Sequence, residues 1–219
     1  DGTLVDTAPD LWAALNAALA TKDLAPVPLS RVNHLVGQGA LVMIERGLAE
    51  HGETVDRDEL RRLHDVFLDH YGANIARDST PFPGCVRALD QLAASGHTLA
   101  VCTNKYAGMS KSLLEELGLS DRFAVIAGPD TFDVKKPDPA HVLKTVEAAG
   151  GTRQRSIMVG DSINDIAAAR DAGVLNIGVS FGYTDVPMAD LNPDHLIDHY
   201  DQLVPIVEAF TARESPVSA

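Results

Sequence analysis

The sequence has two cysteines, no long apolar run and few basic residues, and each scarcity excludes a class of protein. Cys85 and Cys102 cannot build a disulfide framework, and no Cys/His cluster has metal-ligand spacing. No run reaches the roughly 18 apolar residues of a membrane-spanning helix, so we expect no membrane partner. With 18 basic against 31 acidic side chains, the net charge of −13 argues against nucleic acid as the main partner. These absences favour a reduced, cytoplasmic protein.

Apolar residues make up 45% of the 219 positions, which is typical of a globular protein. In roughly the first third of the chain they recur at helical spacing, in stripes that begin at Leu11, Leu41 and Leu60. A further short helix is expected around residues 30–36. This part of the chain predicts a small helical bundle.

The Pro-Phe-Pro-Gly run that begins at Pro81 ends this pattern, and short apolar runs then alternate with helical stretches. The expected strands cover residues 98–102, 123–127, 157–159 and 175–179. The expected helices between them cover residues 106–117, 137–149 and 164–172. Such alternation predicts an α/β fold with right-handed crossovers and a parallel sheet buried on both faces.

Polar residues follow the expected strands, at the edge where open α/β sheets bind ligands. They are Asp1, Thr103, Asn104, Lys105, Lys136, Asp161 and Asp165. Each alone has an ordinary explanation as a turn, a helix cap, a strand-end hydroxyl or a surface loop. Their joint occurrence in this order points instead to one site.

The chemistry that these residue types suggest is phosphoryl transfer from an ester. Carboxylates bind a hard cation such as Mg²⁺, and a hydroxyl, backbone N–H groups and a lysine neutralise phosphate oxygens. A further carboxylate can donate a proton to the leaving alkoxide. The set contains no evident nucleophile.

These segments resemble the four motifs of the haloacid dehalogenase superfamily. The matching runs are Asp1-Gly2-Thr3-Leu4, Thr103-Asn104, Lys136-Pro137 and Gly160-Asp161-Ser162 with Asp165. The helical segment resembles the cap of the phosphoglycolate phosphatase-like branch. The resemblance implies a Rossmann-like core over residues 1–8 and 82–213, a helical cap over residues 9–81, and a flexible tail over residues 214–219.

The resemblance also implies a role for each residue. Asp1 is expected to be the general acid/base and to ligate Mg²⁺ through its carbonyl. Thr103 and the Asn104 backbone are expected to bind the phosphoryl group, which Lys136 neutralises. Asp161 and Asp165 complete the expected Mg²⁺ site. An aspartate at position 1 favours phosphatases and mutases over dehalogenases.

The family's first motif is Asp-x-Asp-Gly-Thr, and Asp1 corresponds to its second aspartate. The expected nucleophile therefore lies two residues before Asp1, on a central strand that precedes residue 1. One interpretation is that the protein has this strand, upstream of Asp1; the other is a binding protein that lacks the nucleophile. Loss of a central strand would expose the backbone groups of its neighbours, which favours the first interpretation.

Candidate specificity residues are Lys105, Arg46 and Gly39. Lys105 follows the second motif, Arg46 could bind a substrate carboxylate, and the Gly-Gln-Gly run ending at Gly39 could present N–H groups to an anion. A solvated arginine and a helix–helix turn are the ordinary alternatives. The resemblance implies hydrolysis of a small phosphorylated metabolite, 2-phosphoglycolate, to glycolate and phosphate through an aspartyl-phosphate. Phosphatases or mutases acting on pyrophosphate or a sugar phosphate are the alternatives, and a monomer or a homodimer is expected.

Overall fold

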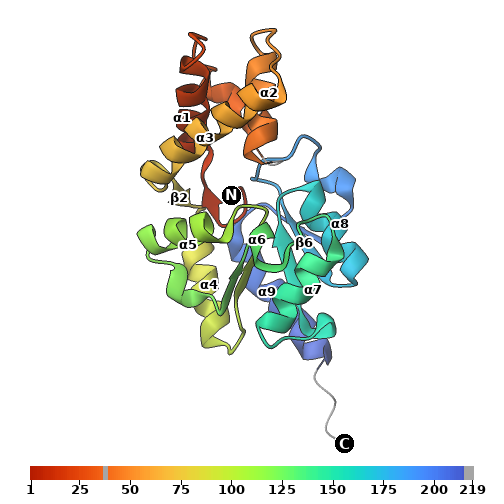
Figure 1. Cartoon of the computed structure of the whole chain (residues 1–219). Helices are drawn as coiled ribbons and strands as arrows, with labels where there is room; N and C mark the ends of the chain where they lie inside the picture. Colours follow the sequence, from red (N-terminus) through yellow and green to blue (C-terminus); the bar gives the residue numbers. More distant parts are fainter. Residues whose placement is uncertain (37–38, 215–219) are drawn as a thin grey trace, which may run out of the picture.

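The structure, a computed structural model, describes residues 1–36 and 39–214 and places a group of helices above an α/β layer (Figure 1). We call the upper part the helical group. It consists of α1 (Ala8–Ala20), the 3-10 helix η1 (Leu29–His34), α2 (Ala40–Ala49) and α3 (Arg57–Ala73). The expected helix over residues 30–36 is thus a shorter 3-10 helix.

The helical group packs around the apolar stripes that the sequence predicts. Leu15, Ile44 and Phe67, one from each α-helix, are at most 1% exposed. Burial of each such side chain contributes about 2 kcal/mol to folding. Helix α3 begins after Asp56, whose carboxylate accepts two N–H groups of the first turn. Packing and capping together fix where this helix lies.

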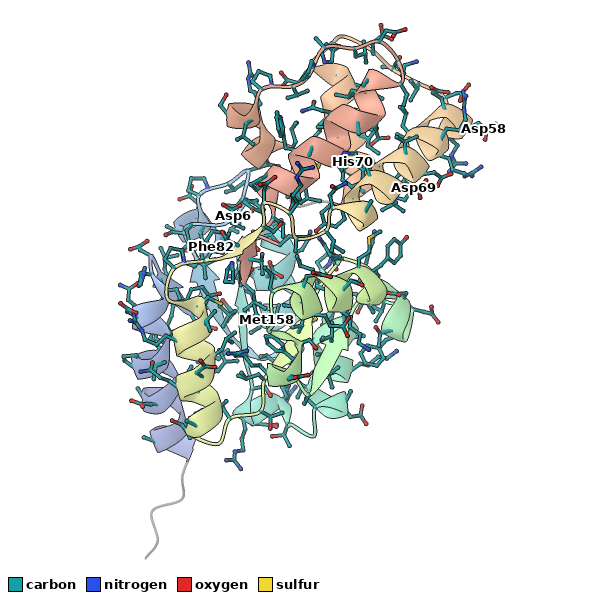
Figure 2. All side chains as sticks on the ribbon, turned by 90° about the vertical axis from the view of Figure 1, so that its left-hand side faces the viewer. Asp6, Asp58, Asp69, His70, Phe82 and Met158 are labelled. Atoms are coloured by element: carbon teal, nitrogen blue, oxygen red, sulfur yellow. The ribbon has the colours of Figure 1, made fainter. Side chains whose placement is uncertain are left out.

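The two chain segments that join the helical group to the layer below it lie side by side. Strand β1 (Val5–Asp6) pairs antiparallel with β2 (Thr80–Pro81), and Figure 2 shows Asp6 and Phe82 at this junction. The carboxylate of Asp10, which is 3% exposed, accepts the N–H groups of Asp78 and Ser79 and the Ser79 hydroxyl. Asp10 therefore fastens the returning segment to the start of α1.

The lower layer alternates helices and parallel strands. Its strands are β3 (Ala100–Cys102), β4 (Val125–Ala127), β5 (Ile157–Gly160), β6 (Leu175–Val179) and β7 (His195–Ile197). Its α-helices are α4 (Cys85–Ala94), α5 (Ala107–Glu116), α6 (Pro129–Phe132), α7 (Pro139–Ala148), α8 (Ile163–Ala172) and α9 (Leu203–Glu214). Its 3-10 helices are η2 (Ser120–Arg122), η3 (Arg153–Arg155), η4 (Met188–Leu191) and η5 (Tyr200–Gln202).

Helices cover both faces of the strands, as a parallel sheet requires. Strand β3 pairs with β4, and β5, β6 and β7 form a second parallel set in that order. Successive side chains of β5 point to opposite faces: Ile157 and Val159 pack with α4 and α9, and Met158 packs with α7 and α8. The predicted α/β fold is confirmed.

Helices α4 and α9 and strand β7 are elements that the sequence patterns above do not predict. Helix α4 buries Cys85, Leu89 and Leu92 at helical spacing, so its signal is present in the sequence. Pro205 lies in the first turn of α9, where a proline weakens the helical signal of the sequence, and β7 has only three residues. Within the described ranges, no helix is both long and apolar enough to cross a lipid bilayer.

Replacing Asp10 by alanine is expected to lower the free energy of unfolding by about 3 kcal/mol, because it leaves the buried N–H and hydroxyl donors of Ser79 without an acceptor. Urea denaturation of the full-length protein measures this. Asp69→Ala, an exposed position on α3, is the control and should change stability by less than about 0.5 kcal/mol. An equally small change in Asp10→Ala would show that Asp10 does not fasten the junction.

Candidate active site

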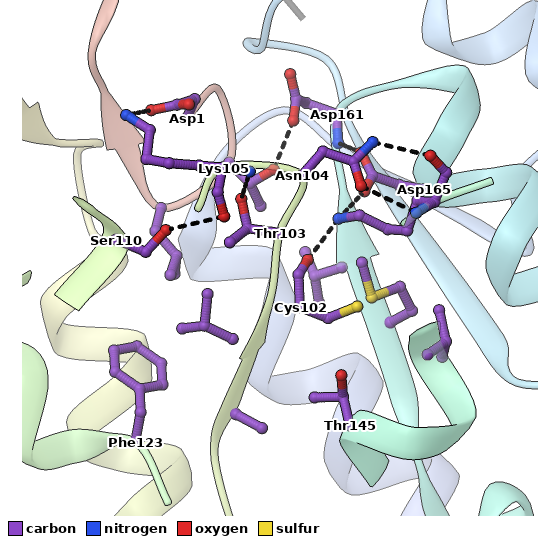
Figure 3. Close-up of a pocket in the computed structure, with 18 of the residues that line it drawn as sticks. Asp1, Cys102, Thr103, Asn104, Lys105, Ser110, Phe123, Thr145, Asp161 and Asp165 are labelled. Atoms are coloured by element: carbon purple, nitrogen blue, oxygen red, sulfur yellow. Dashed lines mark hydrogen bonds and ion pairs between the residues drawn. The ribbon is translucent and has the colours of Figure 1, made fainter. Parts of the chain in front are cut away.

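A cavity of about 870 Å³ opens at the carboxyl ends of β3 and β5, beneath the helical group. Besides Gly39, seven predicted site residues line it, and they come from four separate segments of the chain (Figure 3). They are Asp1, Thr103, Asn104, Lys105, Lys136, Asp161 and Asp165. The cavity continues between β3 and β5, where Val101 and Val159 line an apolar end. In the described part of the chain, no backbone pairing joins these two strands.

Asp161 is a buried carboxylate held from both sides. One oxygen accepts the Thr3 hydroxyl at 2.6 Å and the other accepts the Tyr183 N–H at 2.9 Å. A Cβ at Gly2 or Gly182 would lie within 2.3 Å of an Asp161 side-chain atom, so only glycine permits this approach. Burial and the nearby Asp165 carboxylate raise the pKa of Asp161. A bound cation would relieve this unfavourable burial of charge.

Lys136 and Asp165 form a buried ion pair, with Nζ 2.6 Å from Oδ1. The Lys136 Nζ also donates to the Cys102 carbonyl. Burial disfavours both charges, but each partner stabilises the other, so the pKa of Lys136 is raised and that of Asp165 is lowered. The pair fixes the ammonium at the end of β3.

The second oxygen of Asp165 is engaged at the start of α8. It accepts the N–H of Asp161 at 3.2 Å and both the N–H and the hydroxyl of Ser162, at 3.0 and 2.7 Å. Ser162 and Asp165 thereby form a capping box. Both oxygens of Asp165 thus have partners within the protein. Its role as an Mg²⁺ ligand stays a prediction, and its contacts indicate that Asp165 positions Lys136.

The side chain of Asn104 clamps the backbone of Lys136. Its Oδ1 accepts the Lys136 N–H at 2.9 Å, and its Nδ2 donates to the Lys136 carbonyl at 2.9 Å. The sequence predicts only a backbone role for Asn104, in phosphate binding. The structure adds a link from the β3 end to the segment that carries the lysine.

Lys105 extends toward the helical group. Its N–H donates to the Thr103 hydroxyl at 3.1 Å, and its Nζ lies 2.7 Å from a carboxylate oxygen of Asp1. The same ammonium contacts the hydroxyl of Tyr71 on α3. Burial lowers the pKa of Lys105 to about 7, against a raising effect of Asp10. Lys105 thus connects the site to the helices above it.

The other two predicted specificity residues lie differently. Gly39 lines the cavity and precedes α2 with a φ of 96°, whereas Gly37 and Gln38 lie outside the described residues. Arg46 pairs with Asp185 at 2.9 Å. Arg46 therefore holds α2 to the loop after β6, and substrate binding by Arg46 stays a prediction.

The donor chemistry at this edge fits a hard divalent cation. Asp161 offers a buried carboxylate. A Cβ at Gly182 would lie 2.6 Å from the Gly2 carbonyl oxygen and 2.7 Å from the Asp161 carboxylate carbon, so this one carbonyl lies near Asp161. Across residues 1–36 and 39–214, no three His, Cys, Asp or Glu side chains gather into a metal cluster. A cation here would therefore need carbonyl or water oxygens besides the acids, which is typical of Mg²⁺.

The model of the haloacid dehalogenase-like hydrolase family matches residues 1–179. The chain belongs to this family. A phosphoglycolate phosphatase of Agrobacterium fabrum is 53% identical over 205 residues, which cover 94% of this chain and 88% of that protein. One of Mesorhizobium japonicum is 46% identical over 203 residues, covering 93% and 89%. The crystal structure of a predicted phosphoglycolate phosphatase from Haemophilus somnus superposes with a TM-score of 0.87 at 31% identity, covering 94% of each chain.

The sequence patterns predict no role for several residues of this haloacid dehalogenase-like hydrolase site. Thr3 and Tyr183 hold Asp161, Gly182 allows the close approach, and Tyr71 contacts Lys105. The Phe-Gly-Tyr run just after β6 was a usable signal, because it follows a strand end. Tyr71 gave none, since it falls within a helical stripe that already explains it as core.

Replacing Lys136 by methionine is expected to lower the free energy of unfolding by about 3 kcal/mol, because it leaves the Asp165 charge buried and unpaired. The exposed neighbour Lys135 is the matched control, and Lys135→Met should cost less than about 0.5 kcal/mol. Urea denaturation measures both.

A double-mutant cycle separates the ion pair from general packing. Adding Asp165→Asn to Lys136→Met should destabilise the protein by less than the two single changes together, by about 1–3 kcal/mol. Strictly additive changes would mean that the two side chains do not stabilise each other.

Proposed function

We propose that the protein hydrolyses a small phosphate monoester, 2-phosphoglycolate, to glycolate and inorganic phosphate. The observation that carries this proposal is the convergence of Asp1, Thr103, Lys136 and Asp161 on one end of the cavity. A phosphoryl group needs such a set: a hydroxyl and a cation for its oxygens, a metal-binding carboxylate and an acid for the leaving group. The names of relatives 53% and 46% identical to the chain support the choice of substrate.

In this proposal Thr103 and Lys136 bind the phosphoryl oxygens. The Thr103 hydroxyl lies at the end of β3, and the Lys136 ammonium is held by Asp165 and by the Cys102 carbonyl. Because these contacts fix the ammonium before substrate arrives, little reorganisation accompanies the developing charge. Asn104 supports this arrangement through the backbone of Lys136.

Asp1 acts as the general acid/base. It donates a proton to the leaving oxygen and then activates the water that hydrolyses an aspartyl-phosphate. We expect the nucleophilic aspartate two residues before Asp1, as in the family's first motif. The apolar end of the cavity, between β3 and β5, suits a strand that carries it, because among residues 1–36 and 39–214 no strand pairs with the facing edges of β3 and β5.

Asp161 and the main-chain carbonyl of Asp1 would hold Mg²⁺, the cation typical of the family's phosphatases. When bound, Mg²⁺ supplies charge neutralisation to the phosphoryl oxygens. The residues of the chain orient Asp161 for this role: Thr3 and Tyr183 hold its two oxygens, and glycines leave room beside it.

The helical group fits the role of a cap in this reaction. We assign residues 9–81 to the cap and residues 1–8 and 82–213 to the core. The paired strands β1 and β2 are the joins, and the cavity lies between the two parts. A cap in this position excludes water from the phosphoryl group during transfer. We place the reaction in the cytoplasm, where a small metabolite would be the only partner required.

The full-length protein is expected to release phosphate from 2-phosphoglycolate with a higher kcat/KM than from pyrophosphate, glucose 6-phosphate or β-glucose 1-phosphate. Asp161→Asn should lower kcat at least about 100-fold, because it removes a charge at the metal site. A phosphate-release assay measures both, with Asp69→Ala as the control of unchanged activity. A higher kcat/KM for a sugar phosphate would refute the assignment of 2-phosphoglycolate as the substrate. Full activity in Asp161→Asn would refute the assignment of Asp161 to the active site.

Removal of divalent cations is expected to abolish phosphate release. Without a cation, nothing would neutralise the negative charges of Asp161 and of the phosphoryl oxygens that face it. The measurement is turnover of 2-phosphoglycolate in EDTA, followed by addition of Mg²⁺ and, separately, Ca²⁺. Mg²⁺ should restore turnover. Turnover that continues in EDTA would contradict a metal-dependent reaction.

A further inference from the structure

Lys105 is a buried amine that the proposed reaction does not use, and it is a cation below its lowered pKa of about 7. Its side chain is 9% exposed, and its ammonium lies 2.7 Å from the Asp1 carboxylate. Figure 3 shows Lys105 reaching toward Asp1 and away from Asp165. Lys136 already supplies the cation for the phosphoryl group. Besides its pairing with Asp1, this second ammonium is therefore available to another anionic group of the substrate.

Tyr71 fixes the end of this side chain from the opposite part of the molecule. Its hydroxyl contacts the Lys105 ammonium, which also lies 4.2 Å from the centre of its ring. Tyr71 is 1% exposed and stacks on Phe67, with ring centres 6.3 Å apart. Burial raises the pKa of the Tyr71 phenol, so the hydroxyl stays neutral and accepts from the ammonium. A rigid residue of α3 thus sets where the Lys105 charge lies.

The position of that charge matches the second anionic group of the proposed substrate. In 2-phosphoglycolate the carboxylate is attached through one methylene to the ester oxygen. Asp1 acts at this oxygen in the reaction proposed above. An ammonium that already touches Asp1 therefore lies within reach of a carboxylate next to the same oxygen, and a charge-assisted hydrogen bond can form there.

We propose that Lys105 binds the carboxylate of the substrate and that Tyr71 is the positioning residue that holds Lys105 in place for it. This inference rests on the proposed function and deepens it. Selection of the leaving group then depends on a contact between the helical group and the core. Esters of neutral alcohols gain nothing from this contact, so they bind less tightly.

The test compares two substrates of the full-length protein, 2-phosphoglycolate and 2-hydroxyethyl phosphate, which carries a hydroxymethyl group in place of the carboxylate. The readout is the ratio of their kcat/KM values in Tyr71→Phe and Lys105→Met. Lys105→Met should lower this ratio about 100-fold, the value of a lost charge-assisted bond. Tyr71→Phe, which keeps the ring, should lower it about 10-fold.

The effect of Tyr71→Phe should appear in KM for 2-phosphoglycolate, with kcat changed less than about two-fold, because the contact is made equally in the ground and transition states. Tyr106→Phe is the matched control: Tyr106 is 50% exposed, and its hydroxyl has no partner among the described residues. It should leave the ratio unchanged.

An unchanged ratio in Tyr71→Phe, or a loss of equal size on both substrates, would overturn the proposal. Because Tyr71→Phe keeps the packing of the ring, it carries the test even where Lys105→Met does not fold. Absence of phosphate release from 2-phosphoglycolate by the unmutated protein would instead refute the proposed function, so the two failures are distinguishable.

Discussion

The site depends on the buried ion pair between Lys136 and Asp165. Asp165 caps α8 with its other oxygen, and Asn104 fastens the backbone of Lys136 to the end of β3. One charge pair thus connects three segments that are far apart in sequence. A buried pair of this kind is costly to desolvate, so its value lies in geometry more than in stability. It sets the position of a cation before any phosphate arrives.

Contacts between the two parts of the molecule form a second layer of organisation. The paired strands β1 and β2 lead the chain into the helical group and out of it, and Asp10 binds the outgoing segment at Ser79. Arg46 and Tyr71 then reach from the helical group to Asp185 and Lys105 of the lower layer. Because these contacts surround the cavity, the position of the helical group bears on what the cavity can bind.

Much of this arrangement could be predicted from the sequence. Apolar spacing predicts the helical bundle and the parallel strands, and the carboxyl ends of parallel strands must share an edge. The convergence of residues such as Thr103 and Asp161 follows from that rule. The choice of side-chain partners does not, because it depends on distances between segments that sequence patterns leave undefined. Arg46 could be expected at the substrate or in solvent, and only the tertiary structure pairs it with Asp185.

The same limit applies to Tyr71, whose helical spacing explains it fully as a core residue until the position of Lys105 is known.

The proposed reaction depends most on covalent transfer of the phosphoryl group to the protein. The most direct measurement is an acid-quenched single turnover of the full-length protein with 2-phosphoglycolate labelled on phosphorus. We expect the label to appear transiently on the protein as an acyl phosphate that hydroxylamine releases. Labelled inorganic phosphate that forms with no labelled protein at any time would contradict it.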